Sequence, residues 1–189
     1  EADVVPLFCF VQAASQYGTV AGGELNTVTA KNCFVGGGKS NFANGEHAII
    51  TGGETNSASG NHATVAGGKS NLVSADESTI GGGSSCTVTG SASTIAGGKS
   101  NAASGQYCAI GGGLSNTAMV NYGTICGGQQ NILLTGTHAT VGGGKQNTAS
   151  GQLSTVVGGE TNTASATRSS VLGGKSNAAA GQESSIGGG

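Results

Sequence analysis

Pairs of glycine residues recur along this chain with a period of 15, and this recurrence constrains its fold more than any other feature. The pairs lie at 22–23, 37–38, 52–53, 67–68, 82–83, 97–98, 112–113 and 127–128, and, after one extra residue, at 143–144, 158–159, 173–174 and 188–189. The extra residue falls within 132–135. A fixed period of this length is typical of solenoids, in which each repeat packs only on its neighbours. We therefore predict solenoid repeats over residues 19–189.

The repeat is numbered here from position 1 at Thr19 to position 15 at Cys33. Position 2 is β-branched in every copy: Val20, Val35, Ile50, Val65, Ile80, Ile95, Ile110, Ile125, Val141, Val156, Val171 and Ile186. Two short segments, around positions 2 and 10, alternate as strands do and are separated by Gly, Ser and Asn. No apolar period of 3.6 residues supports a helix. We predict an all-β, single-chain parallel β-solenoid or β-roll, with about 12 turns of 15 residues and two short strands per turn.

Position 8 is a column of asparagines that only Cys86 interrupts. Its members are Asn26, Asn41, Asn56, Asn71, Asn101, Asn116, Asn131, Asn147, Asn162 and Asn177. By strand alternation this column and position 2 point inward, whereas Thr at position 1 points out of the coil. A buried amide bonds the next amide and nearby backbone, so we assign the column a structural role.

Residues 1–18 fit the same frame as a degenerate capping turn. Counting back from Thr19 places Val5 at position 2 and Val11 at the asparagine position. The bulky residues Leu7, Phe8 and Phe10 stand where the repeat has small ones. With Val5 they are the expected cap residues, since the end of a solenoid must be covered.

Composition excludes several classes of function. The net charge is −2 and only 8% of residues are charged, so the sequence does not predict a basic surface that would bind nucleic acid or an anionic membrane. The apolar run 4–11 is far shorter than the ~20 residues of a membrane-spanning helix.

No motif predicts catalysis, a cofactor or a metal. The Gly-Gly-Lys-Ser strings that begin at Gly37, Gly67, Gly97 and Gly173 lack the earlier glycine that a phosphate-binding loop requires. Cys33, Cys86 and Cys108 occupy inward positions several turns apart, too distant for disulfides, while Cys126 points outward. The histidines all fall at position 14, a turn, with His47 and His62 about one rung apart, and no third ligand joins them.

The stretches 58–71 and 149–162 share the motif Ala-Ser-Gly-x-x-(Ala/Ser)-Thr-Val-x-Gly-Gly-x-x-Asn. This motif resembles the head repeats of YadA-like trimeric autotransporter adhesins, and the resemblance covers about residues 13–189. It implies a left-handed parallel β-roll that trimerises on an extracellular or cell surface. The repeat of this chain carries an added glycine and is slightly longer than the repeat of that family.

We therefore expect a non-enzymatic extracellular structural or adhesive rod whose partner is a further copy of itself, together with a host or matrix surface. One alternative is a subunit of an end-to-end extracellular or viral fibre, because the chain stops in mid-turn at Gly187–Gly189 and either continues naturally or is completed by another subunit. Ice binding is a third hypothesis, since Thr recurs at the outward position 1.

Overall fold

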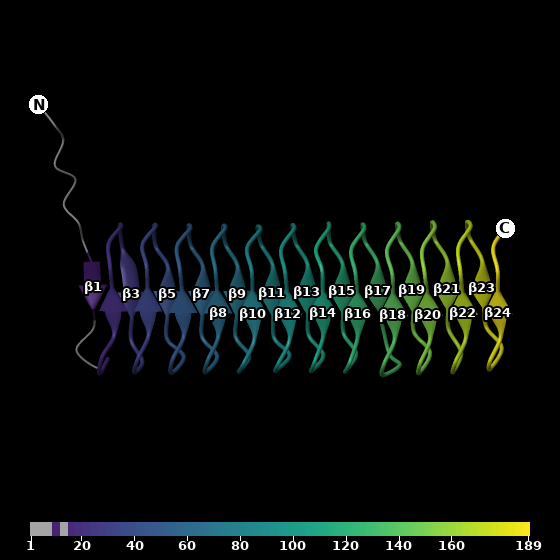
Figure 1. The fold of residues 1–189 in the computed structure, drawn as a ribbon, viewed down its shortest axis with the longest axis horizontal. Coiled ribbons are helices and arrows are strands. Elements are labelled where there is room, and N and C mark those ends of the chain that lie inside the picture. The colour runs from purple at the N-terminus through teal and green to yellow at the C-terminus, as the bar shows by residue number, and fades with distance from the viewer. Residues whose placement is uncertain (1–8, 12–14) are drawn as a thin grey trace, which may run out of the picture.

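The computed structural model describes residues 15–189 and the backbone of residues 9–11. The described chain is all-β, without a helix, and winds into a long rod with its ends at opposite tips (Figure 1). The predicted cap residues Val5, Leu7 and Phe8 lie outside the described residues.

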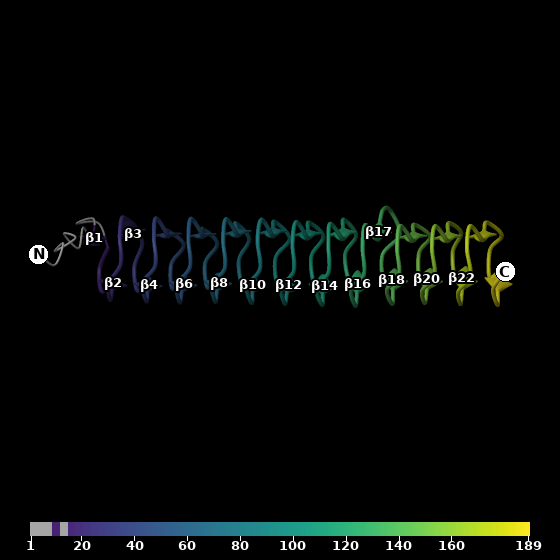
Figure 2. The same ribbon diagram turned by 90° about the horizontal axis from the view of Figure 1, so that it is seen from above.

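Each turn of the coil contributes one short strand to each of two parallel sheets, and the sheets lie on opposite sides of the rod (Figure 2). The odd-numbered sheet contains β1 (Cys9–Val11), β3 (Asn26–Val28), β5 (Phe42–Ala43), β7 (Ser57–Ala58), β9 (Leu72–Val73), β11 (Thr87–Val88), β13 (Ala102–Ala103), β15 (Thr117–Ala118), β17 (Ile132–Leu133), β19 (Thr148–Ala149), β21 (Thr163–Ala164) and β23 (Ala178–Ala179). The even-numbered sheet contains β2 (Thr19–Val20), β4 (Phe34–Val35), β6 (Ile49–Ile50), β8 (Thr64–Val65), β10 (Thr79–Ile80), β12 (Thr94–Ile95), β14 (Ala109–Ile110), β16 (Thr124–Ile125), β18 (Thr140–Val141), β20 (Thr155–Val156), β22 (Ser170–Val171) and β24 (Ser185–Ile186). The predicted parallel β-solenoid with two strands per turn is confirmed.

Strands stack in register, so each residue pairs with the residue at the same repeat position in the next turn. In the even-numbered sheet, for example, Ile80 pairs with Ile95 and Thr79 pairs with Thr94. The side chain at one position is therefore always adjacent to its own column, and each column behaves as a unit.

The second glycine of each pair is required by the backbone, whereas the first is not. Gly53 has φ +92°, a conformation that side chains rarely adopt, and a Cβ there would collide with the carbonyl oxygen of Gly68 in the next turn. A Cβ on Gly52 would meet no atom within 4 Å. The period visible in the sequence is thus set by the turn at position 5.

Two further corners of each turn are left-handed but are not occupied by glycine. They lie at positions 7 and 14, for instance at Ser70 (φ 56°) and His62 (φ 57°). This conformation costs a non-glycine residue about 1–2 kcal/mol. The sequence offers no glycine signal at these corners, and their conformation is a finding of the structure.

The core is a single thin layer between the two sheets. Position 2 is fully buried from Val35 to Val171 and partly buried in the terminal turns, at Val20 and Ile186. It packs against position 10 of the opposite sheet, which is mostly Ala or Val and is Leu133 at its largest. Small inward residues let the two sheets approach closely.

The extra residue in the eighth repeat leaves the strands intact. Ile132 pairs with Thr117 in the turn before it and with Thr148 in the turn after it, and the second interval is longer than the first by one residue. The bulge lies after β17, between Leu134 and Thr137, and stands out from the line of turns in Figure 2.

The first turn is longer than predicted. Cys9 pairs with Asn26, and Val11 pairs with Val28, so Val11 lies at position 10 and its predicted place in the asparagine column was wrong. The interval from β1 to β3 exceeds the regular repeat by two residues. A shift of that size preserves strand alternation, which is why β1 joins the sheet in this register. Phe10 pairs with Thr27 within β1.

Candidate interaction surfaces

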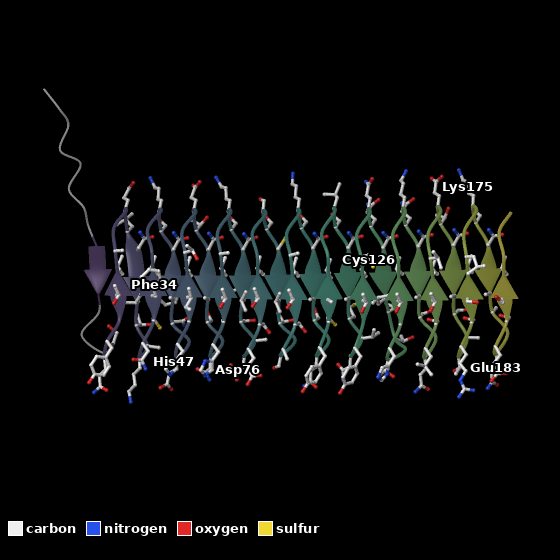
Figure 3. The ribbon with its side chains drawn as sticks, viewed as in Figure 1. Phe34, His47, Asp76, Cys126, Lys175 and Glu183 are labelled. Atoms are coloured by element: carbon white, nitrogen blue, oxygen red, sulfur yellow. The ribbon has the colours of Figure 1, made fainter. Side chains whose placement is uncertain are left out.

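The rod presents four surfaces, which are named here by repeat position. The even face is formed by the outward positions 1 and 3 of the even-numbered strands, and the odd face by positions 9 and 11 beside the odd-numbered strands. The lysine edge contains positions 6 and 7, and the turn edge contains positions 13 and 14. In Figure 3, Phe34 lies on β4 and Cys126 directly follows β16, Lys175 lies on the lysine edge, and His47, Asp76 and Glu183 lie on the turn edge.

The interior is occupied by the asparagine column, whose members are buried except for the half-buried Asn177. Each asparagine side chain of the column makes three hydrogen bonds to backbone, except that of Asn177, which makes two. Asn116 donates through Nδ2 to the carbonyl oxygens of Gly112 and Gly128, both at 2.9 Å, and its Oδ1 accepts the N–H of Asn131 at 2.9 Å. The predicted amide-to-amide bonding is limited to the ends of the column, as between Asn41 and Asn26 at 3.1 Å. The column therefore ties each turn to both of its neighbours.

Of the four cysteines within residues 15–189, three are buried in this interior and one is exposed. Cys33 and Cys108 lie at position 15, where burial raises the pKa of each thiol. Cys86 is buried in the asparagine column, and Cys126 is exposed at position 3 of the even face. A buried thiol with a raised pKa is a poor nucleophile. Cys33 and Cys108 therefore act as small core residues rather than as reactive groups.

The even face is flat and carries no charged residue. Position 1 is mostly Thr, with Thr64, Thr79 and Thr94 on three successive rungs, and position 3 is mostly Ala or Gly. Larger apolar residues protrude near both ends of the rod, Phe34 and Ile49 at position 1 and Val157 and Leu172 at position 3.

The odd face is also uncharged, and its exposed apolar residues were missed by the sequence analysis. They are Phe42, Leu72, Met119 and Leu134, the last two on successive rungs beside the bulge. Period-two alternation places all four at the outward positions 9 and 11, where most other turns carry small residues.

On the lysine edge, side chains of opposite charge pair along the rod. Lys39 bonds Glu24 at 3.1 Å, and Lys69 bonds Glu54 at 3.1 Å. Farther along, Glu160 lies between Lys145 at 3.7 Å and Lys175 at 3.1 Å. The hydrogen bond and the charge of Lys175 lower the pKa of the Glu160 carboxyl, with a further contribution from the charge of Lys145.

The turn edge carries stacked rings. His47 and His62 stack with ring centroids 4.8 Å apart, and a second stack joins Tyr107, Tyr122 and His138 at 5.0 and 4.6 Å. The faces of rings inside a stack are covered by their neighbours, so a ligand would meet mainly ring edges. Within the described residues, no group of three His, Cys, Asp or Glu side chains is placed to hold a metal ion.

Two comparisons bear on relatedness. No protein-family model and no curated protein matches this chain. In the described residues, no helix has the length and apolar character needed to span a bilayer.

Proposed function

We propose that this chain is a non-enzymatic structural rod that associates with further copies of itself. The observation that carries the proposal is the even face, which is flat and uncharged over the length of the described rod and is lined mostly by Thr, Ala and Gly. Depletion of charge is typical of the centre of protein interfaces.

The dimensions of the even face suit such a contact. Twelve strands stacked at ~4.8 Å give a surface about 55 Å long, and positions 1 to 3 of each turn make it about 10 Å wide. Two such faces in contact bury on the order of 1,100 Å² in total, near the lower end of specific interfaces. Phe34 and Ile49 at one end, with Val157 and Leu172 at the other, add apolar area.

The resemblance of stretches 58–71 and 149–162 to adhesin head repeats supports a more specific proposal. On this proposal the rod is displayed on an extracellular surface as a trimer and adheres to a host or matrix surface. An antibody raised against the rod should then label intact, unpermeabilised cells of the source organism, and labelling only after permeabilisation contradicts surface display.

Self-association is tested by analytical ultracentrifugation across a concentration series. We expect a discrete oligomer that Thr79→Lys/Thr94→Lys, at the centre of the even face, dissociates. The matched control is Thr87→Lys on the odd face, which should leave the oligomer intact. A protein that stays monomeric at all concentrations refutes the proposal, and particles that grow in length by electron microscopy favour the end-to-end fibre.

A further inference from the structure

The charged side chains of the described residues all lie on the two edges of the rod. On the lysine edge there are five lysines and three glutamates: Lys39, Lys69, Lys99, Lys145, Lys175, Glu24, Glu54 and Glu160. On the turn edge there are two bases and four acids: Lys31, Arg168, Glu46, Asp76, Glu77 and Glu183. The lysine edge therefore has a net charge of +2 and the turn edge of −2.

The two edges are also complementary turn by turn. Wherever one described turn has charges on both edges, their signs are opposite. These turns carry Glu24 with Lys31, Lys39 with Glu46, Lys69 with Asp76 and Glu77, Glu160 with Arg168, and Lys175 with Glu183. The pattern holds near both ends of the rod.

Attraction within one molecule does not explain this opposition. Lys175 and Glu183 lie on opposite edges of the rod (Figure 3) and are separated by β23 and its flanking residues. An extended segment of that size spans roughly 20 Å, more than two Debye lengths at physiological ionic strength. Each charge instead pairs along its own edge, as Arg168 does with Glu183 at 2.8 Å.

We propose that two copies lie side by side, parallel and in the same rung register, with the lysine edge of one against the turn edge of the next. This inference rests on the self-association proposed above and adds a second contact, to a copy other than the one that packs on the even face. In this arrangement each of the five turns brings opposite charges together. The two broad faces remain free for further contacts.

Other arrangements of the same edges bring like charges together. With antiparallel rods whose charged turns overlap fully, the lysine edge of one copy against the turn edge of the other places Glu24 beside Glu183 and Lys39 beside Arg168. A slip of one rung places Glu24 beside Glu46 in one direction and Lys175 beside Arg168 in the other. Like charges in contact disfavour a wrong partner geometry. For a contact between a lysine edge and a turn edge, the charge pattern therefore selects both the parallel direction and the register. An antiparallel contact between two lysine edges would pair Lys39 with Glu160, and exchange of charges on the turn edge would not weaken it.

Because the contact joins two different edges, it is heterologous, and every copy keeps one edge of each kind for a further neighbour. Such contacts close into a ring or continue as a layer of rods. The ion pairs are exposed, so the contact weakens as the salt concentration rises.

The test exchanges charges on one edge without disturbing the rod itself. The double variant Arg168→Glu/Glu183→Arg keeps the net charge and keeps an ion pair along the turn edge. It turns two attractive contacts with the neighbouring copy into repulsive ones. We expect the dissociation constant at low salt to rise about tenfold, with the melting temperature unchanged.

Exchanging the facing charges on the lysine edge of the same chain, by Lys145→Glu/Glu160→Lys/Lys175→Glu, should restore wild-type association. The matched control is Lys99→Glu, in a turn whose turn edge carries no charge, and it should have little effect.

The possible results distinguish the edge contact from self-association in general. A wild-type rod that remains monomeric at every salt concentration overturns both. A wild-type oligomer that tolerates the turn-edge exchange, or a weakened one that the lysine-edge exchange does not rescue, overturns the edge contact and leaves self-association standing.

Discussion

Replacing Cys86 by asparagine should stabilise the rod, because this residue is the one break in the asparagine column. Cys86 donates its N–H to Asn71 Oδ1 at 2.9 Å, as the asparagines do. Its thiol, however, lies 3.6 Å from the carbonyl oxygen of Gly98, and it offers no amide oxygen to the N–H of Asn101 in the next turn. At this rung the column therefore has only weak thiol contacts to the following turn in place of the amide bonds.

The magnitude follows from the bonds that an asparagine makes elsewhere in the column. At Asn116 there are two donor bonds to glycine carbonyls and one acceptor bond to the next backbone N–H, all at 2.9 Å. Each such bond contributes about 1 kcal/mol net, and burying the larger side chain in a space that the neighbouring turns already provide costs little. Cys86→Asn should raise the free energy of unfolding by about 2 kcal/mol.

Chemical denaturation and hydrogen exchange measure this effect. The midpoint should shift upward, and exchange of the Asn101 amide should slow, since that N–H gains an acceptor. The reverse variant, Asn116→Cys, is the matched control and should lose a similar free energy. A Cys86→Asn protein that is less stable, or whose Asn101 amide exchanges as before, refutes the assignment of the column as a bonded ladder.

Three further predictions concern stability and are measured by thermal or chemical denaturation. Ile95→Asp places an unpaired charge in the core and should cost at least about 4 kcal/mol, whereas Thr94→Asp on the adjacent outward position should stay within about 0.5 kcal/mol; equal losses contradict the inward assignment of position 2. Ser154→Ala should raise the free energy of unfolding by about 1 kcal/mol, because the buried Oγ of Ser154 has no hydrogen-bond partner. Ser93→Ala should lower it by a similar amount, since the Oγ of Ser93 donates to a carbonyl oxygen at 2.9 Å and accepts an N–H at 2.9 Å. Leu153→Asn should gain about 0.5–1 kcal/mol, because Leu153 is exposed at φ 57° and asparagine tolerates that conformation better; a loss indicates that packing at this corner outweighs backbone strain.

The repeat was sufficient to predict the fold because in-register stacking makes the sequence period and the structural period the same quantity. The inward placement of position 2 followed from alternation, as at Ile80, and so did the outward placement of Cys126. The register of β1 did not follow, since counting back by one regular repeat assumed a turn of constant length. Nothing in the composition of residues 9–18 reveals the two additional residues in that turn.

Side-chain bonding at the asparagine column was predicted only in part, for a geometric reason. Stacked amides were expected to bond to one another, but the left-handed glycine of each turn brings carbonyl oxygens within 2.9 Å of Nδ2, as at Asn116. The amide nitrogen is then occupied by backbone acceptors, and Oδ1 is left to the next backbone N–H. The position of those carbonyls depends on the φ of the glycine, which no residue type specifies alone.

The confinement of charge to the edges follows from the same stacking rule. A column brings each side chain within about 5 Å of the same position in the next turn, so a column of like charges repels itself along the whole rod. Alternation of sign, as from Glu24 to Lys39, removes that repulsion on each edge separately. Alternation does not determine whether the two edges of one turn carry like or opposite charges, because solvent ions screen one edge from the other within a single molecule. Opposite charges on the two edges of one turn affect the energy only when a second molecule lies alongside. We therefore connect this pattern with a contact between copies.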